Sequence, residues 1–308
     1  MSLIQVHFVK KGKKFWADNI SSATIFYRLS WLLNIILPLV LVFRSDGLWI
    51  KSMTFEEQPD VNFKHQYLAI LEVVRPFPGH LIYSTYPQFN NLFEAQLIRS
   101  PQVSNQESDH NYDGLYDDLS FELAMPLRGN EEVAGVDLFL MFDYKLRSKV
   151  PFDMEAVVRI NYRSMTTGCR VFVTGDLRLN QRELLHATHH ADNFSHNLSN
   201  MLNEPFPSIL SLEDLMQDYL KRNVTAELSP AAYTKWTSGR DVSNDLFSVE
   251  IRLNYTPQEI TYRPGFWFVI KWAWIQYVAV FAALYVVIEK VRNIVFEQHL
   301  IPTIQCSD

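Results

Sequence analysis

Two apolar stretches, one near each end of the sequence, constrain this chain more than any other feature. The first runs from Ile25 to Phe43 and the second from Phe266 to Ile288. About 20 apolar residues in a helix cross the ~30 Å hydrocarbon core of a bilayer, because a helix rises about 1.5 Å per residue. Both stretches are about that long, so the sequence predicts two transmembrane helices with a large domain, residues 44–265, between them.

Basic residues next to the stretches predict which side of the membrane this domain faces. Four precede the first stretch and two follow the second: Lys10, Lys11, Lys13, Lys14, Lys290 and Arg292. Lysine and arginine near the ends of spans tend to stay cytoplasmic. We therefore expect cytosolic tails at residues 1–24 and 289–308 and an extracytoplasmic domain between the spans. No small-residue cleavage site follows Phe43, which argues against a cleaved signal peptide.

The glycosylation sequences favour the same topology. Four Asn-x-Ser/Thr acceptors lie between the two stretches, at Asn193, Asn197, Asn223 and Asn254, and the only other match in the sequence, Asn19, lies close to the membrane on the predicted cytosolic side. We expect at least two of them to carry a glycan. The only cysteines, Cys169 and Cys306, fall on opposite sides of the predicted membrane, so no internal disulfide is expected.

The intervening domain shows the alternation of apolar and polar residues that is typical of β-strands. Every second residue is apolar in 136–146 and in 247–255, which predicts one side-chain set in a core and the other, including Phe139 and Met141, toward solvent. Shorter patterns of the same kind cover 61–73, 81–85, 121–125, 157–162 and 169–179. Six or seven such strands predict an extracytoplasmic β-rich, sandwich-like domain of two sheets. Apolar residues after Ser211 recur at helical spacing, which predicts one short amphipathic helix at about 212–222 with Ser211 as its capping residue.

The sharpest local motif in the domain is the segment 109–117. Oxygen-bearing side chains occupy positions 1, 3, 5 and 9, as in a calcium loop: Asp109, Asn111, Asp113 and Asp117. Gly114 at position 6 permits a sharp turn, but Ser120 stands where an EF-hand needs glutamate, and the flanks are strand-like. Two interpretations stay open: a loop between strands that holds a structural Ca²⁺, and an Asp/Asn/Gly-rich turn without an ion. No other cofactor is expected.

Motifs of common enzyme classes are lacking. The sequence has no Gly-x-Ser-x-Gly, no phosphate-binding glycine loop and no dinucleotide fingerprint. His186 and His190 have the spacing of a zinc motif without its glutamate, so we interpret the histidines there as loop residues. A net charge of −6 without a basic patch in the domain argues against nucleic acid. The chain is therefore predicted not to be an enzyme.

Several blocks of sequence carry a resemblance to a known family. They are FRSDGLW at 43–49, EEQP at 56–59, GDLRL at 175–179, RNVT at 222–225 and YRPGFW at 262–267. In this order, and over about residues 25–303, the chain resembles the transmembrane protein 231 family. The resemblance implies a component of the Meckel-syndrome (tectonic-like) complex in the ciliary transition-zone membrane. The implied partners are B9-domain proteins, tectonics and other transition-zone membrane proteins, and the implied role is in the diffusion barrier and in cilium assembly and signalling.

Two other functions fit the predicted architecture. An auxiliary two-span subunit of a channel or transporter has the same plan and would co-purify with a pore-forming partner. A membrane-tethered enzyme or ligand-binding β-sandwich would show a deep polar pocket with convergent carboxylates. The resemblance favours the transition-zone component over both.

Overall fold

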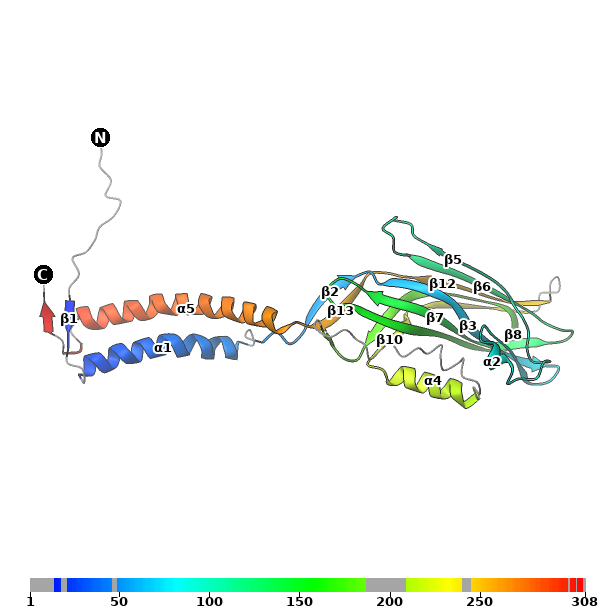
Figure 1. Ribbon diagram of the computed structural model, residues 1–308, viewed down its shortest axis with the longest axis horizontal. Helices are drawn as coiled ribbons and strands as arrows, with labels where there is room; N and C mark the ends of the chain where they lie inside the picture. Colours follow the sequence, from blue (N-terminus) through cyan, green and yellow to red (C-terminus); the bar gives the residue numbers. More distant parts are fainter. Residues whose placement is uncertain are drawn as a thin grey trace, which may run out of the picture. The chain divides into compact units, whose positions relative to one another are not determined.

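The computed structural model describes residues 14–17, 21–45, 49–186, 209–239, 245–298, 300–302 and 304–306 (Figure 1). They fall into two compact units. One unit combines the two ends of the chain, up to Lys51 and from Pro264 onward, and the other is formed by residues 52–263.

The first unit is a pair of long helices. Helix α1 spans Ser22–Arg44 and helix α5 spans Phe266–Glu297. The Ser21 side chain caps α1 by accepting a hydrogen bond from the backbone of Thr24. Short strands from the chain ends, β1 (Lys14–Trp16) and β14 (Ile304–Cys306), pair antiparallel in the same unit, which the sequence patterns did not predict. Both predicted helices are therefore present, and α5 continues nine residues beyond the predicted span end at Ile288.

The two helices pack through a stripe of mostly small or polar residues on α1. Its buried members recur at helical spacing: Ala23, Ser30, Asn34, Pro38 and Val42. The Tyr277 hydroxyl of α5 donates to the Ile35 carbonyl at 3.3 Å, and the rings of Trp31 and Tyr285 lie 6.4 Å apart. Among the described residues, α1 is the one helix long and apolar enough to cross a membrane by length and composition. The second span stays a prediction.

The second unit is built around one large sheet. Nine described strands join in it, seven of them in the order β4-β3-β7-β8-β12-β6-β5, with β10 and β11 also paired to β8. Their bounds are β3 Asp60–Arg75, β4 Gly79–Ser84, β5 Gln102–Ser108, β6 Asp118–Pro126, β7 Glu132–Leu146, β8 Phe152–Gln181, β10 Val224–Leu228, β11 Tyr233–Ser238 and β12 Leu246–Asn254. A smaller sheet has the order β2-β13-β9, with bounds Met53–Glu57, Gln258–Arg263 and Leu185–His186.

Strand β8 corrects the prediction of two separate sheets. The two strands expected at 157–162 and 169–179 are one continuous strand of 30 residues. Its first part pairs with β7, and its second part pairs with β12, β11 and β10. Because one strand serves both halves, the sandwich is a single curled sheet. We call β4, β3, β7 and residues 152–163 of β8 the covered half, and residues 168–181 of β8 with β12, β11, β10, β6 and β5 the open half.

The main core fills the inside of the curl. It draws buried side chains from both halves, among them Phe63 and Phe142 of the covered half and Phe121 and Val249 of the open half. The rings of Phe63 and Phe121 lie 5.7 Å apart in an edge-to-face arrangement, so the two ends of the sheet approach each other there. The alternating pattern of the sequence therefore correctly predicts this core.

A second core on the outer face of the covered half corrects the expectation for Phe139 and Met141. Both residues are buried, at 2% and 1% exposure, rather than turned to solvent. They pack with residues of two helices, α2 (Pro87–Asn90) and α4 (Ile209–Lys221), including Phe89 and Tyr219. Helix α4 is the predicted amphipathic helix, but it begins two residues before Ser211, which therefore lies within the helix and is not its N-cap.

Candidate functional site

The segment 109–117 is the loop of a β-hairpin. Strands β5 and β6 flank it and pair from Gln102↔Ala124 to Ser108↔Asp118. At the base of the loop, the backbone of Asp117 donates to the Ser108 carbonyl at 2.8 Å. The structure thus places the four predicted calcium ligands together, between two strands and not between helices.

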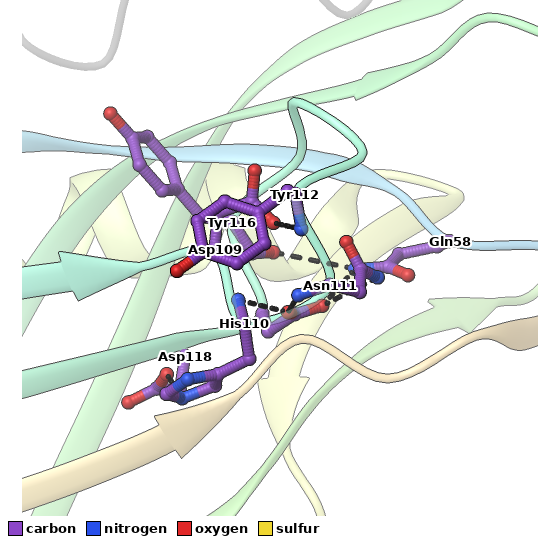
Figure 2. Close-up of polar contacts among 8 residues, drawn as sticks. Gln58, Asp109, His110, Asn111, Tyr112, Tyr116 and Asp118 are labelled. Carbon is purple, nitrogen blue, oxygen red and sulfur yellow. Dashed lines mark hydrogen bonds and ion pairs between the residues drawn. The ribbon is translucent and has the colours of Figure 1, made fainter.

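Side-chain oxygens within the loop accept hydrogen bonds from its own backbone (Figure 2). The Asp109 carboxylate accepts from the amides of Tyr112 at 2.7 Å and Gly114 at 3.0 Å. The Asn111 and Asp113 oxygens accept from the amides two residues onward, at 2.9 and 2.8 Å. Two residues within these turns, Tyr112 with φ 60° and Gly114 with φ 86°, have a left-handed backbone conformation. The loop is therefore shaped by its own Asp and Asn side chains.

Asp117 fixes the loop to a distant part of the chain. One carboxylate oxygen accepts from the Gln58 side chain at 2.9 Å, and the other accepts from the amides of His110 at 2.8 Å and Asn111 at 3.4 Å. These hydrogen bonds, that from Gln58 first, lower the pKa of Asp117. Gln58 lies in the connection between β2 and β3, so it ties the hairpin loop to the start of the covered half.

This arrangement does not present a ready calcium site. Ca²⁺ requires six to eight oxygens converging on one point, whereas here the oxygens of Asp109, Asn111, Asp113 and Asp117 accept hydrogen bonds within the loop or from Gln58. In the part of the chain that the structure describes, no three His, Cys, Asp or Glu residues cluster as metal ligands. Calcium binding stays a prediction, and it requires some of these hydrogen bonds to open.

Sequence reasoning missed a second set of contacts that fixes the same hairpin. The Glu107 carboxylate accepts from the Phe63 amide at 2.9 Å and from the Tyr255 hydroxyl at 3.2 Å. Burial raises the pKa of Glu107, although both hydrogen bonds and the charge of His65 oppose the shift. Glu107 and Tyr255 are 148 positions apart, and no local motif signals such a contact.

The four glycosylation acceptors differ in what the structure shows of them. Asn193 and Asn197 lie outside the described residues. Asn223 and Asn254 are both exposed, at the end of α4 and at the end of β12. The Asn254 side chain donates to Asp176 at 3.1 Å. Exposure leaves room for a glycan at both described sites, and their modification stays a prediction.

The outer face of the open half carries a polar groove of about 830 Å³. Glu122 and Glu250 are the carboxylates among its lining residues. Glu250 is 7% exposed and is held by ion pairs with Arg170 and Arg252. Arg252 also stacks over the Phe172 ring, 5.7 Å from its centre. The two arginines neutralise the Glu250 carboxylate. This arrangement is typical of a structural ion-pair cluster and not of a general acid or base.

The comparisons with known proteins agree with the resemblance seen in the sequence. The family model described as Transmembrane protein 231 matches residues 1–305. The chain is 36% identical to transmembrane protein 231 of Xenopus tropicalis over 306 residues, covering 99% of this chain and 96% of the relative. It is 37% identical to the Rattus norvegicus protein over 287 residues, covering 92% and 89%. With the Homo sapiens protein it shares 33% identity over 304 residues, covering 99% and 95%. The chain belongs to the transmembrane protein 231 family.

Proposed function

We propose that this chain is a non-enzymatic structural component of the ciliary transition-zone membrane complex. The observation that carries the proposal is the match to one membrane-protein family from residue 1 to residue 305. The ciliary role itself is what the resemblance implies. The domain architecture is compatible, because a β domain with its own filled core leaves its outer surfaces for contact with other proteins.

The proposal includes a second transmembrane segment in α5. Large apolar side chains are exposed along both helices, for example Leu32 at 54% on α1 and Trp274 at 64% on α5. Contiguous exposed apolar surface of this kind indicates contact with lipid or with another protein. With two spans the termini lie on the cytosolic side and the β domain lies outside. A contact between α5 and α1 supports two paired spans. The Arg292 guanidinium of α5 lies over the rings of Tyr27 and Trp31 of α1, at 5.5 and 5.9 Å from the ring centres.

This topology can be tested by asking which acceptors carry a glycan, because glycans are added only on the luminal side of the membrane. Each of the four acceptors is changed separately to glutamine in the full chain, and glycosidase-sensitive gel mobility is compared. Loss of a mobility step with Asn223→Gln or Asn254→Gln places the β domain in the lumen or outside. The opposite topology would follow from two results together: the unchanged protein carries no glycosidase-sensitive glycan, and an acceptor added in one of the tails becomes modified.

Within the complex, the β domain packs laterally against other ectodomains, and the tails and spans meet cytosolic and membrane partners. B9-domain proteins and tectonics are the proposed partners, and many such assemblies in one membrane zone would obstruct lateral diffusion. A structural Ca²⁺ in the loop 109–117 belongs to this proposal as a stabilising ion and not as a catalytic one.

Deletion of residues 52–263, with both helices joined by a flexible linker, tests the role of the β domain. We expect the deleted protein to reach the membrane but to fail to co-purify with transition-zone proteins and to leave the barrier defective in cells lacking the native protein. The full chain expressed at the same level is the control. Restoration of assembly and barrier by the deleted protein would overturn the proposed role of the domain.

A further inference from the structure

The free edges of the β domain differ in how they are protected against pairing with another strand. The outer edge of β4 is occupied by a following segment, since the Ile82 amide donates to the Leu97 carbonyl at 2.9 Å and the Arg99 amide to the Ile82 carbonyl at 3.2 Å. Strand β11 carries Lys235 and an irregular register at Thr237. Charged residues, bulges and covering segments are the usual protection of exposed edges.

Strand β5 has none of these protections. Within the described residues it pairs with β6 alone, over seven residues and without a register shift. Its sequence contains no lysine, arginine, proline or glycine. The one charged residue, Glu107, is turned inward to Phe63 and Tyr255. The stretch from Gln102 to Gln106 therefore presents a neutral, largely exposed edge.

We propose that this edge pairs antiparallel with the same edge of a second copy of this chain. With the two-fold axis at Ser104, Ser104 faces Ser104, Gln102 faces Gln106, and Val103 faces Asn105. All five facing residues are uncharged, so no like charges meet. One surface is then complementary to itself, as a two-fold interface requires.

Charge selects the antiparallel orientation. The hairpin loop next to β5 carries Asp109, Asp113 and Asp117. Parallel pairing would bring the two acidic loops side by side. Antiparallel pairing places them at opposite ends, separated by about ten strand residues or roughly 33 Å, which is several Debye lengths.

A further feature favours a second copy as the occupant. The membrane helix α1 confines every copy to one surface, which raises the effective concentration of a weak edge contact. This inference does not rest on the proposed ciliary location.

Cysteine cross-linking in membranes tests the pairing. In the full chain with Cys169→Ser and Cys306→Ser, Ser104→Cys should give a dimer with a short bis-maleimide reagent. The matched control is Thr237→Cys, an exposed position on the protected strand β11. We expect about ten-fold more dimer from Ser104→Cys, the ratio that a preference of 1.4 kcal/mol produces. Gln102→Cys and Gln106→Cys should cross-link to each other when co-expressed and little when expressed alone.

A charge at the axis provides a second measurement. Ser104→Lys should abolish most co-precipitation of two differently tagged copies, because two ammonium groups would face each other, whereas Thr237→Lys should leave it unchanged. Unchanged chymotrypsin resistance of both variants shows that the domain is folded, because the new lysine adds no cleavage site for that protease. Equal dimer yields from Ser104→Cys and Thr237→Cys would overturn the proposal. Cross-linking of Ser104→Cys only to a different protein would also overturn it, in favour of a strand from another chain.

Discussion

The covered and open halves of the curled sheet share one core but differ on their outer faces. In the covered half, helices α2 and α4 bury Phe139 and Met141 in a second apolar cluster. In the open half, no described element covers the outer face, which carries the ion pairs of Glu250 with Arg170 and Arg252. The same strand periodicity thus yields an interior layer in the covered half and an uncovered face, within the described residues, in the open half.

The largest expected difference concerns an aromatic residue on each outer face. Phe139→Ala should lower the free energy of unfolding by about 3–5 kcal/mol, because it leaves a cavity beneath α4. Phe172→Ala in the open half should cost about 1 kcal/mol, since it removes a partly exposed ring and its stacking with Arg252. Urea unfolding of the full chain in detergent, followed by proteolysis, measures both. Equal losses would remove the distinction between the two faces.

Two buried glutamates provide the next comparison. Glu155 in the covered half bonds Lys64 at 2.6 Å, and its side chain is 4% exposed. Burial alone would lower the pKa of Lys64, but Glu155 and Asp143 together raise it. Lys64→Met should therefore cost about 2–3 kcal/mol, because it leaves a buried carboxylate with a weakened set of partners.

Arg170→Met is the matched change in the open half. Its partner Glu250 keeps Arg252 at 3.1 Å, and the Arg170 side chain is 54% exposed, so the expected cost is at most about 1 kcal/mol. Thermal unfolding of the Lys64→Met and Arg170→Met variants at neutral pH measures the two losses of stability. A larger loss for Arg170→Met than for Lys64→Met would show that the open face is held more tightly than its exposure indicates.

A smaller effect is expected from Glu107, where the two ends of the sheet meet. Its pKa is raised in the folded protein, so its contribution to stability is full below the unfolded pKa and is lost as pH rises through the folded pKa. Glu107→Gln keeps a carbonyl oxygen for Phe63 and Tyr255 and should leave stability at pH 7 unchanged or raised by up to about 1 kcal/mol. The free energy of unfolding, measured from pH 4 to 7, should change less with pH in the variant than in the unchanged protein. A steeper fall of stability with rising pH in the variant would contradict this assignment.

The smallest effect is expected at Asp117 in the hairpin loop. Its pKa is lowered, so the stability it supplies is present above its unfolded pKa and is lost as pH falls through the folded value. Asp117→Asn should speed amide hydrogen exchange at His110 and Asn111, which it bonds, and leave exchange in the covered half unchanged. Unaltered exchange at both amides would show that Asp117 does not order the loop.

The parts of the fold that the sequence predicted are those with a strong apolar period. The alternation in 247–255 and the helical period of α4 each reflect burial on one side, and the structure has a strand and a helix there. Strands β5 and β11 were missed because their residues are mostly polar and exposed, so no period marks them. Phe139 was misplaced because its cover, α4, lies about 70 residues later in the chain.

The candidate site shows the same limit. The Asp and Asn residues of 109–117 could be found because they are adjacent in sequence. Gln58, which bonds Asp117 at a separation of 59 residues, and the inward turn of Glu107 depend on how the sheet curls. Local spacing therefore predicted which side chains gather in the loop. It did not predict which donor groups form hydrogen bonds with their oxygens.

The location of the endogenously tagged protein in ciliated cells tests the proposed function most directly. Imaged against markers of the ciliary base, it should form a ring at the transition zone that disappears when a tectonic or B9-domain partner is removed. Signal spread through the plasma membrane or endoplasmic reticulum, unaffected by those partners, would contradict the proposal and leave an auxiliary membrane subunit as the function to test next.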